Sequence, residues 1–392
     1  MPPCALLPHA YENLVRLAAW MPFERAAREL QAMSGVQVSD STVRRQALAA
    51  GAIWEQIQTE QAQPAGSKRF PLPQQDPAER MLMSSDGAMV PLRGGGWAEV
   101  KTLVIGEVVS PSQKQPTVRS QAHSYFSRLV DAATFADLAS AEIARRGVDR
   151  AKEVAAVQDG AEWLQGFVDG HRPDALRILD FAHAAGYLGQ IEEQAQLLGY
   201  HLPKGWLAVL LHQLKHHGPR RVLSHLQRLE RRWSFSALSE ALRYLRKREP
   251  LMQYPQFQAD GWPIGSGSVE SGNKVVMQAR LKGAGMRWLP ANVNAMLTLR
   301  NMVSNDRWSE GWGQQRQWRK ESQHTRRKQR SLQRSQRLRH QIEQQLLRWY
   351  LLLPPPKPAA PPAPPKGRTE AQRRWGRQTF SPKALQLRHA KN

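Results

Sequence analysis

Three acidic residues that are far apart in the sequence, Asp86, Asp159 and Glu270, each lie beside a predicted strand end or a glycine-rich turn. Their segments are Ser84-Ser85-Asp86-Gly87, Val157-Gln158-Asp159-Gly160 and Gly267-Ser268-Val269-Glu270-Ser271-Gly272-Asn273. Divalent cations such as Mg²⁺ bind hard oxygen ligands that converge from different elements of one scaffold, and a pair of such cations can promote phosphodiester chemistry. The three carboxylates therefore predict a metal-binding active site.

Asp180 is the main alternative to Asp159 as the second carboxylate. It also follows a predicted strand, in the segment Ile178-Leu179-Asp180-Phe181-Ala182-His183. We prefer Asp159, because its strand comes directly after the helix that follows the first three strands. An Asp before a Gly is more often a simple turn residue, so the interpretation depends on considering the three acidic residues together.

The composition of the chain favours a large, basic protein. It has 392 residues, of which 41% are hydrophobic, enough for two or three domains with a buried core. Its 56 Lys and Arg residues against 33 Asp and Glu residues give a formal charge of +23. This charge attracts polyanions, so nucleic acid is the expected partner, although a ribosomal or other basic protein would show the same excess.

The same survey excludes several classes of protein. The single cysteine, Cys4, rules out an internal disulfide and any cysteine-based zinc site. No apolar run reaches the roughly 20 residues that a membrane helix needs, and the N-terminal sequence lacks the pattern of a secretory signal. We therefore expect a soluble, cytoplasmic protein without a membrane partner.

The elements expected around the acidic residues alternate between strands and helices. Apolar and alternating runs predict five strands, at 81–86, 100–109, 118–125, 152–158 and 175–179. The glycines between 93 and 96 suit a hairpin, and helices are expected at 135–146 and 161–168. Three antiparallel strands, a helix, a strand, a helix and a strand form an α/β sequence in ribonuclease H-like order.

The first 60 residues are predicted to be helical and to resemble a helix-turn-helix. A turn at Ser34-Gly35 precedes a helix that Ser39 or Asp40 can cap. That helix would present Arg44 and Arg45 to DNA, although any two-helix corner gives the same pattern.

Changes in composition divide the chain into six parts. The linker is rich in proline and glycine, and the C-terminal tail combines a proline run with basic residues and is expected to be disordered in isolation. The parts are a helical DNA-binding segment at 1–60, a linker at 61–78, a catalytic core at 79–183 and 259–303, an all-helical insertion at 184–258, a basic helix at 304–353 and the tail at 354–392.

Over about residues 80 to 303 these motifs resemble those of the DDE transposases of bacterial insertion sequences, closest to the ISKra-type group of the Mutator-like superfamily. The resemblance implies a ribonuclease H-like core interrupted by an all-helical insertion. It makes Asp86, Asp159 and Glu270 the catalytic residues and metal ligands, and it matches Asp180 and His183 to a separate Asp-x-x-His element. The latter two are therefore expected to support the site or to provide an alternative ligand.

The resemblance also implies cofactors, partners and a location. Two Mg²⁺ ions, with Mn²⁺ as a substitute, would serve DNA cleavage and strand transfer at the ends of an insertion sequence. The partners would be double-stranded DNA, both terminal inverted repeats and target DNA, and further copies of the chain that pair two ends. The protein would associate with the bacterial nucleoid when bound to DNA.

Basic residues after Glu270 are candidates for phosphate contacts. They are Lys274 and Arg280 on the same predicted helix, and Lys282 and Arg287 in the loop that follows. An ordinary solvated surface would give the same pattern. Two other functions share the sequence features, namely an inactive or domesticated DNA-binding protein of transposase descent and a ribonuclease H-like nuclease without strand transfer.

Overall fold

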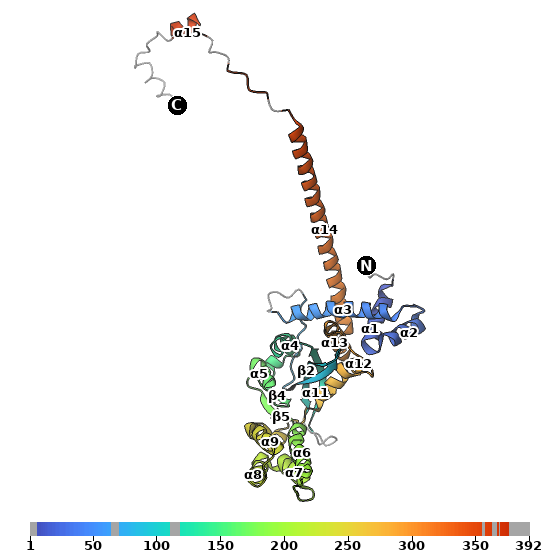
Figure 1. Ribbon diagram of the computed structural model, residues 1–392, viewed down its shortest axis with the longest axis vertical. Helices are drawn as coiled ribbons and strands as arrows, with labels where there is room; N and C mark the ends of the chain where they lie inside the picture. The colour runs from blue at the N-terminus through green and yellow to red at the C-terminus, as the bar shows by residue number, and fades with distance from the viewer. Residues whose placement is uncertain are drawn as a thin grey trace. The chain divides into compact units, whose positions relative to one another are not determined.

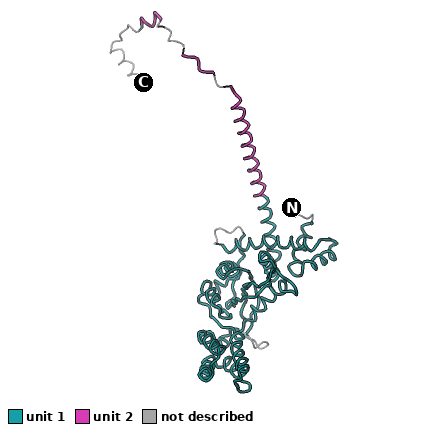
Figure 2. Tube along the Cα trace, in the orientation of Figure 1, with its two compact units in different colours: residues 1–323 teal, residues 324–392 magenta. Residues whose placement is uncertain are grey.

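The computed structural model describes residues 6–63, 70–109, 118–354, 357–362, 367 and 369–375. The chain divides into two units, residues 1–323 and residues 324–392 (Figure 2). The first unit contains the sheet and the acidic residues identified above, so most of the description concerns it.

A five-stranded mixed sheet lies at the centre of the first unit (Figure 1). The strands are β1 (Arg80–Pro91), β2 (Trp97–Val109), β3 (Arg119–Arg128), β4 (Glu153–Gln158) and β5 (Leu176–Leu179), in the order β3-β2-β1-β4-β5. The pairs β1–β2 and β2–β3 are antiparallel, whereas β4 pairs in parallel with both β1 and β5. All five predicted strands are present, and the protein has the predicted mixed α/β architecture.

One face of the sheet is covered by α4 (Ala132–Arg146) and α5 (Glu162–His171). Met81 and Met83 of β1 point to this side and pack with Phe135 and Phe167 of the two helices. Because side chains alternate along a strand, Leu82 points to the other side and joins a separate core.

Residues 181–259 are helical and provide most of that second core. The helices are α6 (Phe181–Leu197), α7 (Trp206–His217), α8 (Pro219–Glu230), α9 (Ser236–Lys247), the short 3₁₀ turn η3 (Glu249–Met252) and α10 (Tyr254–Ala259). Their buried side chains pack with Leu82, Ala155, Val157 and Ile178 of the sheet. The helical segment and the sheet therefore share apolar contacts.

The N-terminal segment forms α1 (Pro8–Trp20), α2 (Phe23–Ser34) and α3 (Asp40–Gln61). Ser39 caps α3, since its side chain accepts a hydrogen bond from the Thr42 amide at 3.2 Å. The α3 helix packs closely on α13 (Pro290–Ser304), where a Cβ on Gly51 would overlap the carbonyl group of Ala295. The three helices thus share one hydrophobic core with α13.

Two buried arginines attach the end of α1 to the segment that follows Glu270. Arg280 donates to the Ala18 carbonyl at 2.9 Å, and Arg300 donates to the Ala19 carbonyl at 3.0 Å. Cations suit the C-terminal carbonyls of a helix, which carry partial negative charge. The N-terminal helices are therefore joined to the rest of the first unit by directed bonds as well as by apolar packing.

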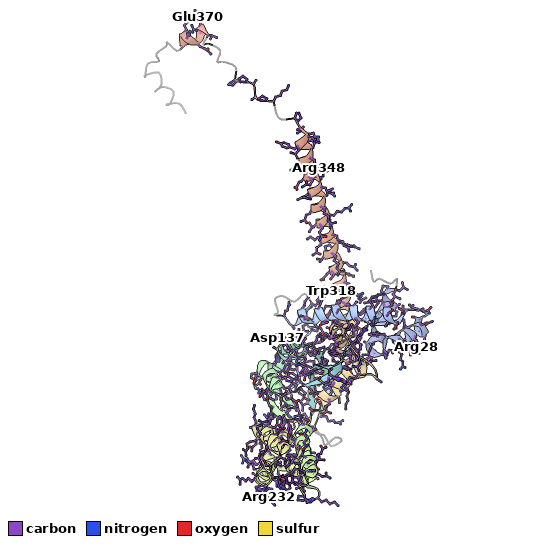
Figure 3. The ribbon with its side chains drawn as sticks, in the orientation of Figure 1. Arg28, Asp137, Arg232, Trp318, Arg348 and Glu370 are labelled. Atoms are coloured by element: carbon purple, nitrogen blue, oxygen red, sulfur yellow. The ribbon has the colours of Figure 1, made fainter. Side chains whose placement is uncertain are left out.

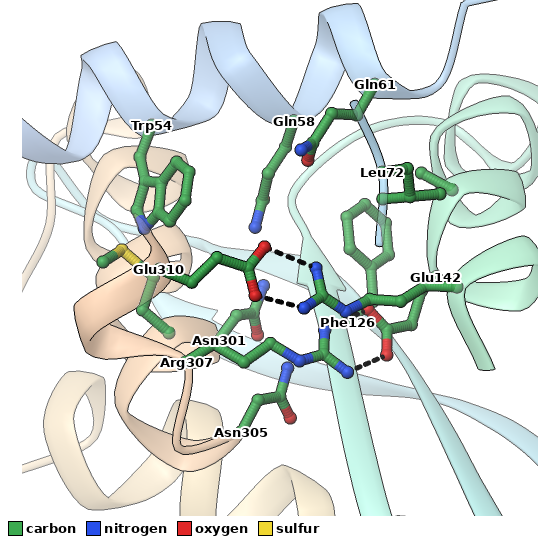
Figure 4. Close-up of a pocket in the computed structure, with 13 residues that line it drawn as sticks. Trp54, Gln58, Gln61, Leu72, Phe126, Glu142, Asn301, Asn305, Arg307 and Glu310 are labelled. Atoms are coloured by element: carbon green, nitrogen blue, oxygen red, sulfur yellow. Dashed lines mark hydrogen bonds and ion pairs between the residues drawn. The ribbon is translucent and has the colours of Figure 1, made fainter. Parts of the chain in front are cut away.

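A buried ion-pair network links α4 to the start of α14 (Trp308–Leu352), and Figure 4 shows it. Arg307 donates to both oxygens of Glu142, at 2.6 and 2.7 Å, and Arg145 donates to both oxygens of Glu310. Burial raises the pKa of Glu142, but Arg307, with Ser124 and Arg145, outweighs this and holds the pKa below its ordinary value. The paired charges satisfy one another where water has little access.

The second unit contains the distal part of α14 and the short helix α15 (Glu370–Trp375). The expected basic helix is thus present, whereas much of the tail expected at 354–392 lies outside the described residues, as do residues 64–69 of the expected linker. Among the described helices, none combines the length and the apolar composition that crossing a bilayer requires.

Candidate active site

Strand geometry places Asp86 and Asp159 on the same side of the sheet. Asp86 lies within β1, four residues after Leu82, and Asp159 follows the end of β4, two residues after Val157. Leu82 and Val157 both point into the core formed with residues 181–259. Because strand side chains repeat with a period of two, both aspartates extend these rows of side chains.

The Asp86 carboxylate is partly buried and close to other acidic groups. Its Oδ1 accepts a hydrogen bond from the Gly87 amide at 2.7 Å, and its Oδ2 accepts one from Asn273 Nδ2 at 2.8 Å. Burial raises its pKa to about 6; the Gly87 amide opposes the shift, while the charges of Asp159, Glu270 and Glu99 add to it. Asp159 and Glu270 therefore both lie within electrostatic range of Asp86.

A glycine turn held by the helical segment positions Asp159. Asp159 Oδ1 accepts a hydrogen bond from the Ala161 amide at 2.9 Å, and its main-chain carbonyl accepts one from the Tyr244 hydroxyl. Gly160 has a φ of 79°, and a Cβ there would lie 2.6 Å from Arg248 Nε. Only glycine fits this left-handed, tightly packed position, which explains the Asp-Gly pair in the sequence.

Glu270 lies on α11 (Gly267–Gly272), a short helix that packs against β1, β2 and β3. A Cβ on Gly272 would lie 2.6 Å from Val104 and 3.1 Å from Tyr125, so this glycine lets the helix approach the sheet closely. The Glu270 side chain is exposed, and among the described residues it has no hydrogen-bond or ion-pair partner. It is thus available to an added ligand.

Directly after α11 the chain forms η4 (Asn273–Gln278), a π-helical turn. Its altered register leaves the carbonyls of Val275 and Val276 to accept hydrogen bonds from Arg300, at 2.5 and 3.2 Å. Single π-helical turns occur often at functional sites, and this one begins with the residue that contacts Asp86.

Asn273 joins the glutamate helix to the central aspartate. It is 3% exposed, and its Nδ2 donates to Asp86 while its Oδ1 has no partner in the described part of the chain. Sequence reasoning missed this role. The signal was its position three residues after Glu270, about one helical turn, which places both side chains on one side of the helix.

Asp180, the alternative to Asp159, accepts two main-chain hydrogen bonds. It is 5% exposed; Oδ2 accepts from the His183 amide at 2.9 Å and caps α6, and Oδ1 accepts from the Ser266 amide at 2.8 Å. Both oxygens are therefore occupied by main-chain donors, one of which belongs to the segment that leads into α11. Asp180 therefore holds the chain that leads into the Glu270 helix.

His183 lies in an aromatic cluster beside the Asp159 turn. Its ring is 5.4 Å from that of Tyr187 and 5.8 Å from that of Tyr244, and the two tyrosines stack at 4.2 Å. The Arg248 guanidinium lies 3.7 Å from the Tyr244 ring and donates to the Gly160 carbonyl at 2.7 Å. Sequence reasoning missed Tyr187, Tyr244 and Arg248, because no local pattern indicates that their helices contact Asp159.

The predicted DNA-contacting residues fall into two groups. Arg280 is 1% exposed and bonded to α1, so it is a core residue and a phosphate contact is not proposed for it. The others have exposed side chains: Arg44, Arg45, Lys274, Lys282 and Arg287.

Arg44 and Arg287 line one cavity of about 330 Å³ together with Arg93, at the junction of α3 and the loop before α13. Lys282 and Arg287 line a neighbouring cavity that also contains Trp97. The structure thus brings arginines from distant parts of the sequence onto one surface.

The acidic cluster offers ligands that suit a hard divalent cation. Asp86, Asp159 and Glu270 present only oxygen, and their mutual repulsion is what a bound cation would offset. Among the described residues, no three His, Cys, Asp or Glu side chains form a complete set of metal ligands.

A comparison with models of protein families finds none that matches the chain, and a comparison with curated protein sequences finds no match. The geometry of the sheet and of its acidic residues consequently carries the interpretation of function.

Proposed function

We propose that this protein is a DDE transposase, which uses divalent metal ions to cleave DNA at the ends of an insertion sequence and to transfer the strands to a target. The observation that carries the proposal is the cluster of carboxylates, in which burial and the charges of Asp159 and Glu270 act together on Asp86. The strand order β3-β2-β1-β4-β5 supports it, because a ribonuclease H-like core is expected to have this order.

Asp86, Asp159 and Glu270 would hold two Mg²⁺ ions, or Mn²⁺ in their place. Bound there, the ions would supply activation of a water or 3′-hydroxyl nucleophile and stabilisation of the charge that develops on the leaving oxygen. Asn273 orients the Asp86 carboxylate through the 2.8 Å hydrogen bond. Asp180 holds the approach to α11 through the Ser266 amide, so it acts on Glu270 indirectly.

Double-stranded DNA is the proposed partner, at the terminal inverted repeats and at the target. The exposed cations Arg44 and Arg287 support this, because they share one cavity on the first unit. Residues 184–258 would be the helical insertion in the ribonuclease H-like core. The protein would act in the bacterial cytoplasm as a homo-oligomer that pairs two DNA ends.

The test is cleavage of duplexes taken from the DNA that borders the gene, with Mg²⁺ and with EDTA as the control. Asp86→Asn, Asp159→Asn and Glu270→Gln should each reduce cleavage by at least about 100-fold, because loss even of a residue that only orients a metal ligand costs about 10–100-fold. DNA binding, measured by fluorescence anisotropy, should stay nearly unchanged.

Asp180→Asn is the informative comparison. It should weaken cleavage without abolishing it, since it loosens the approach to α11 but removes no ligand. Full cleavage by Asp159→Asn together with none by Asp180→Asn would show that Asp180 is the second ligand. Cleavage without joining of the 3′ end to a second duplex would identify a nuclease instead of a transposase.

A further inference from the structure

A second basic surface lies in the helical segment, outside the cavities described above. Helices α7 and α8 enclose a groove of about 490 Å³, whose lining includes Lys204, Trp206, Arg220, Arg221, His225 and Arg228. Between 203 and 232 the sequence has seven Lys and Arg residues and one acidic residue, Glu230. Arg232, just past the end of α8, is labelled at the end of the first unit that is farther from α1–α3 (Figure 3).

The arrangement of α8 separates its apolar side from its basic side. Val222, Leu223 and Leu226 are buried against the rest of the helical segment. Arg221 and Arg228 are seven residues apart, about two turns, so they lie on one side of the helix roughly 10.5 Å apart along its axis. This separation spans about three base pairs at a rise of about 3.4 Å each.

Among the described residues, few acidic side chains lie close enough to neutralise the cations of the groove. Arg220 is 91% exposed, and its ion pair with Glu249 is long, at 3.9 Å. Within the described part of the chain, no carboxylate pairs with Lys204, Arg221 or Arg228. Grouped like charges repel one another, and a bound polyanion would offset this repulsion.

The aromatic residue of the groove indicates which form of nucleic acid suits it. Proteins that bind single strands offer exposed aromatic faces for base stacking. Trp206 is 5% exposed, and its Nε1 donates to His225 Nε2 at 2.9 Å, so its ring is not such a platform. The groove therefore offers cations and polar groups for a phosphate backbone, and its tryptophan ring is not exposed for base stacking.

We propose that the α7–α8 groove binds the phosphate backbone of double-stranded DNA, as a contact separate from the acidic site. The choice of DNA over another polyanion rests on the proposed function.

The experiment compares two full-length double variants that lose the same charge. Arg221→Gln with Arg228→Gln removes two groove cations, and Arg243→Gln with Arg246→Gln removes two exposed cations of α9 that do not line the groove. Binding of a labelled random-sequence duplex is measured by anisotropy over a range of NaCl concentrations. The groove variant should reduce the slope of log K against log[salt] by about 2, and the α9 variant should leave it unchanged.

Equal slopes for the two variants would overturn the proposal. So would a groove variant that loses binding to polyglutamate but keeps its DNA slope, because the groove would then suit an acidic protein. An Asp86→Asn background keeps this test apart from the proposed function: its loss of cleavage concerns the carboxylates, whereas the effect of the groove on DNA binding is measured without chemistry.

Discussion

Asp86 is the acidic residue of the candidate site whose pKa its surroundings raise, to about 6. Its carboxylate is partly buried on the central strand and faces the negative charges of Asp159 and Glu270, so ionising it is unfavourable and its pKa is about 6. Burial and like charges both penalise the ionised form. In the proposed function, a bound cation would offset this unfavourable free energy.

We predict that Asp86→Asn stabilises the metal-free protein at pH 7. The pKa of Asp86 is 3.8 in the unfolded chain and about 6 in the folded protein. Between these pH values the folded protein binds the proton more strongly than the unfolded chain does, so the free energy of unfolding falls as the pH rises. Asparagine carries no charge, so the variant should unfold at pH 7 with a free energy about 1–2 kcal/mol higher, after allowance for solvent screening.

Urea unfolding in EDTA at several pH values measures this difference. The difference in the free energy of unfolding between the variant and the wild type should narrow as the pH falls below 6. Mg²⁺ should stabilise the wild type only. Asp137→Asn, at the exposed position labelled in Figure 3, is the control and should change little. A variant that is less stable than the wild type at pH 7 would contradict the prediction.

Sequence reasoning proposed the three acidic residues, Asp86, Asp159 and Glu270, but not the residues that contact them. Asp159 was preferred from element order, and the structure adds that the Asp180 carboxylate accepts hydrogen bonds from the His183 and Ser266 amides. Tyr244 and Arg248 could not be predicted, because their bonds to the Asp159–Gly160 turn connect residues more than 80 positions apart. Such contacts depend on how helices pack, which leaves no local pattern.

At the level of elements, the contact between α11 and the sheet sets the position of Glu270. Gly272 has no side chain, so the helix lies directly on Val104 and Tyr125. Immediately afterwards the chain turns into η4, and Asn273 reaches Asp86. The closeness of helix and strand therefore couples the geometry of Glu270 to that of Asp86.

We predict that Gly272→Ala lowers both stability and activity. Its Cβ would lie 2.6 Å from Val104 Cγ2, so the helix must shift, and overpacking of this kind costs about 1–3 kcal/mol. Gly267→Ala, on the same helix, places its Cβ in open space and should leave thermal stability and metal-dependent cleavage nearly unchanged. Equal behaviour of the two variants in thermal unfolding would show that close packing of α11 is unimportant.

Elements with strong local patterns were predicted well, and those defined by distant contacts were not. The strands follow apolar or alternating runs, but β1 extends from Arg80 to Pro91, well past the predicted end at 86, because antiparallel pairing with β2 continues from Gly87 to Pro91. The packing of α3 on α13 was not foreseen. Gly51 and Ala295 meet only in the folded chain.

At the level of the whole molecule, charge is divided unevenly between the two units. Residues 324–392 contain 17 Lys and Arg residues and two Glu residues, a net +15 of the total +23. The first unit, which contains the acidic site, therefore has a much smaller excess for its size. Composition could indicate a polyanion partner, but only the division into units shows that most of the excess charge lies outside the part that contains the sheet.

We predict that truncation after Gln323 separates DNA affinity from folding. The part of α14 that packs in the first unit contains Trp308 and Trp312, both buried, and Gln315, which donates to the Ala50 carbonyl at 2.7 Å. All three remain in the truncated chain, so its thermal midpoint should change by no more than about 2 °C. Truncation after Arg307 removes them and should destabilise the protein strongly.

The same truncation should flatten the salt dependence of DNA binding. Each phosphate contact contributes about 0.9 to the slope of log K against log[salt], so loss of a segment with a net charge of +15 should reduce the slope by several units if that segment contacts DNA. Anisotropy titrations of the full and truncated chains measure this. An unchanged slope with unchanged stability would mean that binding depends on the cations of the first unit, where Arg44 and Arg287 then become the residues to test.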